Sequence, residues 1–436
     1  MKKPRQAKKA GGLFRVGQEP TSLACAVPPG CALLPYPEES KQWETTGNLY
    51  LEGDNLDILQ LLQATHAGSI QMIYIDPPYN TGKSFVYNDS FPQPQDWCQM
   101  MHPRLQVART LLTDSGVIFI SIDDNEVVNL RQMAHEIFGA QNFVAQICWR
   151  GRGGRQDSKH FAVVHEYILC YAKDAAQFQA GNQVKQGEVY PKYDAAKQRY
   201  YKTRLLRKWG SNSRRSDRPN LYYPIPAPDN TPVYPMLSAA EAGCWRWGQA
   251  RMERELAAGN VEFVMTEQGY VAYEKIYAPP EGKPATKKFT TWIDNIGVSS
   301  GAPLLKQLLG AKVFDYPKPV ELIKRLIQMS GAGPDDVILD FFSGSATTAH
   351  AVMELNAETG SRRQFIMVQW PEPTDAGSAA HLAGYANISE IGKERIRRAG
   401  EQIKEKHKSS ELDLGFRVYK TSKQTEHQAG YNIKGE

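Results

Sequence analysis

Three short apolar runs constrain the fold of this chain more than any other feature of its sequence. SIQMIYI (69–75), GVIFISI (116–122) and DVILDFF (336–342) each alternate along the chain with segments of helical periodicity, such as NLDILQLLQATH. Short apolar runs bounded by loops are typical of buried strands, and their alternation with helices predicts βαβ units. We therefore expect an α/β domain built on a mostly parallel sheet.

The same pattern divides the chain into segments. The alternation is regular from about residue 46, fades after about 150, and resumes near 296. Gly, Pro, Tyr and Arg are frequent in the middle, which predicts an inserted recognition region, although residues 160–173 (with FAVVHEYILCYAK) are expected to return to the main sheet as a strand. The predicted boundaries are an N-terminal arm at 1–45, α/β halves at 46–150 and 296–375, the insert at 151–295, and a C-terminal helix and tail at 376–436.

Composition excludes several classes of protein. The six cysteines form no C-x-x-C pair, so no metal site is expected and a reducing cytoplasm suits the chain. No apolar run reaches the roughly 18 residues needed to span a membrane, and no apolar segment follows the basic N-terminus as in a signal peptide. The sequence therefore predicts a soluble, cytoplasmic protein with no membrane partner.

The net charge of +5 is mild, but its distribution is uneven. Between Arg199 and Arg218 there are eight basic residues and one acidic residue, interleaved with tyrosine and tryptophan. Basic side chains neutralise phosphates and aromatic faces accept unstacked bases, although a solvated basic surface has the same composition. The candidate phosphate-binding residues are Arg204, Arg207, Lys208, Arg214 and Arg215.

The segment DPPYNTGKS (76–84) permits two interpretations. Gly82, Lys83 and Ser84 resemble the end of a phosphate-binding P-loop, whose first glycine would fall at Pro77. Proline has no N–H to donate and a fixed φ, so this loop cannot enclose a phosphate. The P-loop interpretation fails.

Asp76, Pro77, Pro78 and Tyr79 suit a different chemistry, the activation of a weakly nucleophilic amino group. A carboxylate that accepts one N–H and a backbone carbonyl that accepts the other draw a conjugated nitrogen toward tetrahedral geometry. Two prolines fix the carbonyls in place, and Tyr79 offers a flat face to an extruded base. The alternative is a rigid turn that only ends a strand.

A second candidate site follows the strand 336–342. Ser343, Gly344 and Ser345 are small enough for a ligand to approach the backbone, and the N–H groups at the start of the next helix favour a carboxylate. Many strand–turn–helix junctions share this composition. The segment lacks the G-x-G-x-x-G of nicotinamide enzymes.

Taken in order, six motifs resemble those of the β-class DNA amino-methyltransferases, in which the D-P-P-Y motif precedes the F-x-G-x-G motif. They are LEGDNLDIL, YIDPPYNTG, GVIFISIDDNEV, HEYILCYAK, FDYPKPVELIKRLI and DFFSGSATTAHAV. The tail KERIRRAGEQI…LDLGFRVYK is similar to the modification subunits of type III restriction–modification systems. The resemblance implies a Rossmann-like methyltransferase sheet of about seven strands with helices on both faces, and S-adenosylmethionine as cofactor.

The resemblance also implies site residues. Asp76, Pro77, Pro78 and Tyr79 would form the catalytic turn. A larger set would contact the cofactor: Asp54, Lys318, Pro319, Asp340, Phe342, Ser343, Gly344, Ser345, Thr347, Thr348 and Gln369. Asp54 serves equally well as a helix N-cap, and Gln369 stands where the family has an acid for the ribose, with Glu372 three residues later. Ala346 replaces the family's second glycine and is expected to place a methyl group beside the cofactor.

These inferences predict a site-specific methyltransferase that modifies adenine N6 in double-stranded DNA. Cytosine-N4 methylation uses the same chemistry, and a catalytically idle DNA-reading subunit and an RNA methyltransferase are further alternatives. Cytosine-C5 methylation needs a cysteine nucleophile, usually in a Pro-Cys pair, and the chain has no such pair. Family analogy implies a homodimer and a possible restriction subunit. The insert is short for a type III modification subunit, which also admits a stand-alone enzyme.

Overall fold

A computed structural model describes residues 31–82, 89–151, 160–408 and 411–422. These residues form two compact units, one built from the described residues up to 182 and from 288 onward, and the other from 183–287. The N-terminal basic segment, together with Lys83 and Ser84 of the rejected P-loop, lies outside the described residues.

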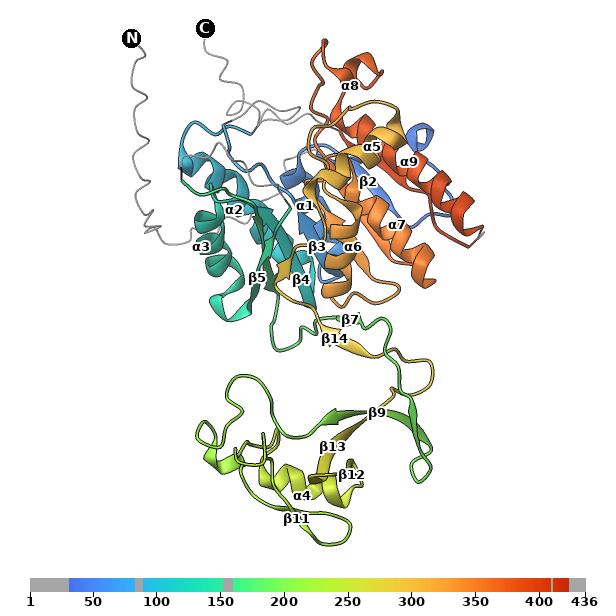
Figure 1. The fold of residues 1–436 in the computed structure, drawn as a ribbon. Helices are drawn as coiled ribbons and strands as arrows, with labels where there is room; N and C mark the ends of the chain where they lie inside the picture. The colour runs from blue at the N-terminus through green and yellow to red at the C-terminus, as the bar shows by residue number, and fades with distance from the viewer. Residues whose placement is uncertain (1–30, 83–88, 152–159, 409–410, 423–436) are drawn as a thin grey trace. The chain divides into compact units, whose positions relative to one another are not determined.

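The first unit contains a mostly parallel sheet that has ten strands within the described residues (Figure 1). In order across the sheet, they are β1 (Leu33–Pro35), β18 (Arg417–Thr421), β2 (Leu49–Glu52), β17 (Gln364–Gln369), β16 (Val337–Asp340), β3 (Ile70–Ile75), β4 (Leu112–Ile122), β6 (Glu166–Ala172), β5 (Phe143–Trp149) and β15 (Trp292–Ile293). Neighbours from β18 to β4 run parallel, whereas β6 is antiparallel to both β4 and β5. The seven strands from β2 to β5 are those expected of a methyltransferase sheet, and β1, β18 and β15 extend it.

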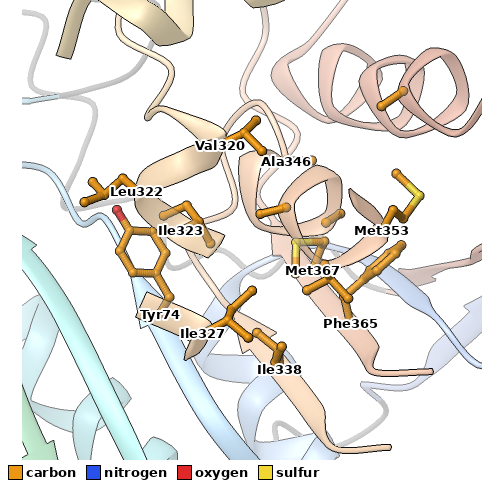
Figure 2. Close-up of a cluster of buried hydrophobic side chains, with 14 of the residues drawn as sticks. Tyr74, Val320, Leu322, Ile323, Ile327, Ile338, Ala346, Met353, Phe365 and Met367 are labelled. Atoms are coloured by element: carbon orange, nitrogen blue, oxygen red, sulfur yellow. The ribbon is translucent and has the colours of Figure 1, made fainter. Parts of the chain in front are cut away.

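The central strands are apolar throughout because both faces of the sheet are covered. In β3, Met72 and Tyr74 belong to one buried cluster, and Ile73 and Ile75 belong to a second cluster on the other face. Successive side chains of a strand point to opposite faces, so a strand covered on both sides must be apolar at every position. Figure 2 shows Tyr74 in the first cluster, next to side chains of α6.

Two sets of helices provide this cover. The helices that contribute to the second cluster are α1 (Asn55–His66), α2 (Pro94–Leu111) and α3 (Val127–Phe138). Those that contribute to the first cluster are α5 (Gly301–Leu309), α6 (Val320–Met329), α7 (Thr347–Thr359), α8 (Ala379–Leu382) and α9 (Ile388–His407). The short 3₁₀ turns of this unit are η1 (Pro37–Glu39), η2 (Ala140–Asn142) and η4 (Val298–Ser300).

The second unit has its own small core, formed by Trp245, Trp247, Met252 and neighbouring apolar residues. Its four-stranded antiparallel sheet consists of β12 (Val261–Thr266), β13 (Gly269–Tyr277), β9 (Arg199–Leu205) and β8 (Lys192–Asp194). Its other elements are η3 (Pro219–Leu221), β10 (Ile225–Pro226), β11 (Pro232–Val233) and α4 (Gln249–Ala257). The chain enters and leaves through two paired strands, β7 (Asn182–Val184) and β14 (Thr286–Lys288).

The structure differs from the sequence-based expectation at both ends of the first unit. Leu33–Pro35, expected in the extended arm, pairs with β18 from the C-terminal tail at the edge of the sheet. The two paired segments are far apart in the sequence, so no local sequence pattern predicts their pairing. Within residues 31–82, 89–151, 160–408 and 411–422, no helix is long and apolar enough to cross a membrane.

Candidate active site

The fold brings the two candidate turns together because β3 and β16 are adjacent in the sheet. The chain leaves β3 toward α2 on one face and leaves β16 toward α7 on the other, so a crevice opens at the carboxyl ends of the two strands. A cavity of about 570 Å³ lies there, and both Asp76 and Gly344 line it. Had the two turns opened on different faces, a shared site would have been impossible.

Most of the residues expected to bind the cofactor line this cavity. They are Asp54, Lys318, Asp340, Phe342, Ser343, Gly344, Ser345, Thr347, Thr348 and Gln369, and the catalytic turn contributes Asp76 and Pro78. Pro77 is buried, Tyr79 contacts Lys318 beside the cavity, and Pro319 is the N-cap of α6. The roles of these residues remain predictions.

The turn that carries Asp76 is held by buried hydrogen bonds. The indole N–H of Trp97, a fully buried residue of α2, donates to the carbonyl oxygen of Pro78 at 2.7 Å. Asn80 follows with a positive φ of 58°, and its backbone N–H donates to the buried carboxylate of Asp89 at 3.0 Å. The turn that carries Asp76 is therefore held by hydrogen bonds from neighbouring segments as well as by its two proline rings.

Lys318 links the catalytic turn to the antiparallel strand β6. Its ammonium group lies 3.2 Å from a carboxylate oxygen of Asp76 and 3.1 Å from Glu166, and it donates to the hydroxyl of Tyr79 at 2.7 Å. The Tyr79 hydroxyl in turn donates to Glu166 at 3.2 Å. Glu166 is only 3% exposed at its side chain, whereas Asp76 is 27% exposed toward the cavity.

These contacts act on the pKa values of the cluster. Burial raises the pKa of Asp76, the Lys318 ammonium opposes that effect, and the negative charge of Glu166 adds to it. Burial alone would lower the pKa of Lys318, but the two carboxylates hold it above its ordinary value. When all three groups are ionised, the cluster carries one more negative than positive charge.

The turn after β16 is shaped by its neighbours on both sides. Gly344 has a positive φ of 50°, and a Cβ there would lie 3.2 Å from the ring of Phe314. Its backbone N–H donates to the side-chain oxygen of Gln369 at 2.6 Å, and the Gln369 amide nitrogen donates to the carbonyl oxygen of Trp370 at 2.9 Å. Gln369 thus braces the turn in this structure; its proposed bond to a ribose stays a prediction.

The methyl group of Ala346 does not lie beside the cofactor cavity, where the resemblance to the family led us to expect it. Its side chain is fully buried in the first hydrophobic cluster, where Figure 2 shows it beside Val320, and it does not line the cavity. Its backbone, however, has φ 59° and ψ 41°, the left-handed conformation that glycine adopts without strain. The cost of the substitution is therefore in the backbone rather than in space for a cofactor.

We expect Ala346→Gly to change the free energy of unfolding by less than about 1 kcal/mol. Relief of the left-handed backbone is worth about 1–2 kcal/mol, which is offset by about 0.8 kcal/mol of lost methyl burial and about 0.4–1 kcal/mol of unfolded-chain entropy. Chemical denaturation measures the change, and titration with S-adenosylhomocysteine should give the wild-type affinity. A large gain in that affinity would mean that the methyl group obstructs the cavity after all.

Asp340, at the end of β16, is a buried carboxylate whose ionisation is costly. Burial raises its pKa to about 7, although Phe342 N–H and Thr348 Oγ1 donate to its two oxygens at 3.1 and 2.5 Å. The folded protein therefore binds a proton that the unfolded chain releases near pH 4. Between about pH 4 and pH 7, the contribution of Asp340 to stability falls as pH rises, because at this group the native state holds more protons than the unfolded state.

Asp340→Asn should remove this dependence, since an amide can accept from Phe342 and donate to Thr348 without being charged. We expect the variant to melt at a higher temperature than the wild type at pH 8, with the difference shrinking toward pH 5. Thermal unfolding of both proteins across that range is the measurement. An equal or lower melting temperature for the variant at pH 8 would contradict the assignment.

Asp54 fulfils the helix-capping alternative while also lining the cavity. Its carboxylate accepts from the backbone N–H of Leu56 at 2.8 Å as the N-cap of α1, and it pairs with Arg104 of α2 at 3.1 Å. Arg104 also lines the cavity and was not foreseen. The helix that carries Arg104, α2, begins at Pro94 and contains Pro103 in its interior.

Sequence reasoning also missed Phe314 and Tyr316, which line the cavity, and Glu166, which pairs with Lys318 beside it. Glu166 lay within the quoted HEYILCYAK motif but had no assigned role, and Phe314 and Tyr316 precede the assigned Lys318 in FDYPKP. A buried acid inside an otherwise apolar strand was the one available signal for Glu166, because a charge in such a position requires a partner.

The candidate DNA-binding residues all lie in the second unit. Arg204 of β9 forms an ion pair with Glu274 of β13, and Arg214 pairs with Glu241 at 2.9 Å. Arg215 lies 4.2 Å above the ring of Tyr222. Among the described residues, no carboxylate pairs with Arg207 or Lys208, which directly precede Trp209, an exposed tryptophan. These two basic side chains are therefore better placed than the others to meet phosphates.

The sheet order, the antiparallel β6 beside β4, and the two turns at one cavity define an α/β methyltransferase fold. A family model described as a DNA methylase, of the N6 and N4 type, matches residues 70–401. The chain belongs to this family of DNA methylases, whose cofactor is S-adenosylmethionine. The resemblance inferred from the six motifs and the fold that it implied are confirmed.

Three relatives show the extent of the sequence similarity. The Mod subunit of the type III restriction–modification enzyme StyLTI, from Salmonella typhimurium, is 35% identical over 87% of this chain and 61% of its own length. The Mod subunit of EcoPI, from Escherichia phage P1, is 33% identical over 95% of this chain and 72% of its own length. The type II methyltransferase M.KpnI, from Klebsiella pneumoniae, is 34% identical over 81% of this chain and 87% of its own length.

The cavity suits S-adenosylmethionine in its chemistry. Gly344 has a positive φ and no Cβ, so its backbone is open to a ligand in the cavity that it lines, next to the N-terminus of α7. That helix end favours an anionic group such as the amino-acid carboxylate of the cofactor. Asp76 and Phe342 lie in the same cavity, one a carboxylate and the other an aromatic ring.

Proposed function

We propose that this protein is a site-specific DNA methyltransferase that transfers a methyl group from S-adenosylmethionine to adenine N6 in double-stranded DNA. One observation carries the proposal: in a chain of the DNA methylase family, the Asp76 carboxylate and the Gly344 turn line a single cavity. The acceptor group and the methyl donor can therefore be held side by side.

In the proposed reaction, Asp76 accepts one N–H of the target amino group. We assign the second N–H to a backbone carbonyl oxygen of the same proline turn, which the Trp97 indole holds in place at Pro78. The net negative charge of the Asp76–Lys318–Glu166 cluster stabilises the positive charge that develops on the attacking nitrogen. S-adenosylmethionine supplies the methyl group, and Asp76 is placed to take the proton that the nitrogen then sheds.

Tyr79 is proposed to stack on the extruded base, with a contribution of about 1–3 kcal/mol. The Lys318 ammonium lies over the ring, 4.8 Å from its centroid, and donates to its hydroxyl, so the ring is held at one face and at its hydroxyl. A fixed ring loses little entropy when a base arrives.

The alternatives are distinguished by one experiment. Wild-type protein and Asp76→Ala are incubated with tritiated S-adenosylmethionine and unmethylated duplex DNA, and the labelled DNA is digested to nucleosides. N6-methyladenine supports the proposal, and N4-methylcytosine supports the closest alternative, which uses the same turn. DNA binding is measured in parallel, and RNA replaces DNA in a second reaction. DNA binding without any transfer by the wild type would support an idle DNA-reading subunit, and label found only in the RNA would support an RNA methyltransferase.

The second unit is proposed to recognise DNA. We expect replacement of both Arg207 and Lys208 by glutamine to weaken duplex binding and to reduce the slope of log K against log salt by about 2, since each phosphate contact contributes about 0.9. Arg204→Gln is the matched control, because Arg204 is already paired with Glu274. Binding measured across a salt series tests this; an unchanged slope for the double variant would move the phosphate contacts elsewhere.

The partners remain proposals as well. Relatives named as type III Mod subunits suggest that this chain acts with a restriction subunit, while M.KpnI is named as a type II methyltransferase. Family analogy further suggests a homodimer. Light scattering of the purified protein gives its oligomeric state.

A further inference from the structure

A fully buried arginine lies behind the turn that follows β16. Arg395, on the C-terminal helix α9, is 0% exposed, and its Nη1 donates to three oxygen atoms of the turn. These are Ser345 Oγ at 3.0 Å, Ser345 O at 3.3 Å and Thr347 Oγ1 at 2.6 Å. Arg395 does not line the cavity, whereas Ser345 and Thr347 do.

The helix approaches the turn closely at a second point on the same face. Gly392 lies three residues before Arg395, and a Cβ at Gly392 would come within 3.2 Å of the Gly344 carbonyl oxygen and 2.6 Å of the Tyr50 hydroxyl. Ile388, one turn earlier, lines the cavity itself. Residues spaced by three and four lie on one helix face, so this face of α9 packs against the side of the turn that points away from the cavity.

The charge of Arg395 has no carboxylate in direct contact among the described residues. Its Nε lies 3.5 Å from His350 Nδ1, and Glu354 is reached only through the other nitrogen of that imidazole, 3.5 Å further on. Its Nη2 is buried without a hydrogen-bond partner in the described part of the chain. Burial lowers the pKa of Arg395 to about 9, so the group remains protonated at neutral pH.

A buried cation without an adjacent anion is costly unless something offsets it. Here the cation lies directly behind the N-terminus of α7, whose own dipole is also positive at that end. The charge of Arg395 and the dipole of α7 both favour negative charge on a group bound at the turn. An anionic group there would relieve both at once.

We propose that Arg395 is a positioning residue that holds the Ser343–Thr347 turn in shape and that its buried charge selects the amino-acid carboxylate of the cofactor. This inference rests on the proposed function, in that it takes S-adenosylmethionine as the ligand of the cavity. It assigns a role to the C-terminal helix, which lies far along the chain from both motifs of the site.

The test compares two ligands that differ in the amino-acid portion. S-adenosylhomocysteine carries the carboxylate, and 5′-methylthioadenosine lacks the amino-acid group. Isothermal titration with Arg395→Met should show binding of S-adenosylhomocysteine weakened by about 10- to 100-fold, the usual effect of losing an interaction with a charged group, with much less change for 5′-methylthioadenosine. Arg395→Gln keeps a hydrogen-bond donor for the turn but carries no charge. We expect it to show the same selective loss of S-adenosylhomocysteine binding.

Arg398→Gln is the matched control, because Arg398 is on the same helix but half exposed and bonded to Glu394. It should bind both ligands like the wild type. Unchanged binding of both ligands by Arg395→Met and Arg395→Gln would overturn the inference, and so would an equal loss for both ligands, which would reduce Arg395 to a support of the fold. If the Met variant does not fold, the Gln variant decides. Failure of the wild type to bind S-adenosylhomocysteine would instead overturn the proposed function.

Discussion

Asp76→Ala is expected to lower the rate of methyl transfer by at least about 10²–10³-fold, the usual effect of removing one preorganised polar group from an active site. The side chain is the part of the catalytic turn that would accept an N–H of the target base, and its truncation leaves the nitrogen conjugated with its ring. The prolines and the Trp97–Pro78 hydrogen bond do not involve the Asp76 side chain, so the turn should keep its shape. Single-turnover transfer to duplex DNA is the measurement.

Two further measurements make this result specific. Affinity for S-adenosylhomocysteine should change little, because the turn around Gly344 is untouched. Asp335→Ala is the matched control: it removes a carboxylate of the same unit that is 62% exposed and paired with Arg362 at the surface. Transfer by Asp76→Ala at the wild-type rate would show that the carboxylate has no part in the reaction.

Lys318→Met is expected to have the largest effect on stability, a loss of about 3 kcal/mol in the free energy of unfolding. Removing one partner of a buried ion pair costs about 3–5 kcal/mol because the other charge is left uncompensated. The lower end applies, since Asp76 is 27% exposed and water screens part of its charge, whereas Glu166 is 3% exposed. Chemical denaturation measures the loss.

A second substitution tests the reason for that loss. Glu166→Gln in the Lys318→Met background removes the more deeply buried of the two carboxylates and should recover part of the lost stability. A double variant less stable than Lys318→Met would mean that lost packing of the lysine side chain, rather than uncompensated charge, is responsible. The exposed pair of Arg362 and Asp335 is the control, because its disruption should cost at most about 1 kcal/mol.

Much of the architecture could be predicted because it depends on local patterns. The buried strands of the α/β halves and the short turns after β3 and β16 follow from apolar runs and from proline, glycine and serine in the sequence. The resemblance to DNA methyltransferases added the expectation that both turns belong to one site, and the cavity contains both. Ala346 shows the limit of prediction from motifs. The motif showed that alanine replaces the family's second glycine, but only the structure showed that the substitution places alanine in a left-handed backbone conformation.

By itself, the sequence determined which chemical groups are available and on which strand, turn or helix each one lies. Only the tertiary structure decided which of these groups meet: Lys318 with Glu166, Asp54 with Arg104, and Arg395 with Ser345. The physical reason is that periodicity reports the burial of one element, whereas a charge finds its partner across elements. That choice depends on the order of strands in the sheet and on the face that each helix covers.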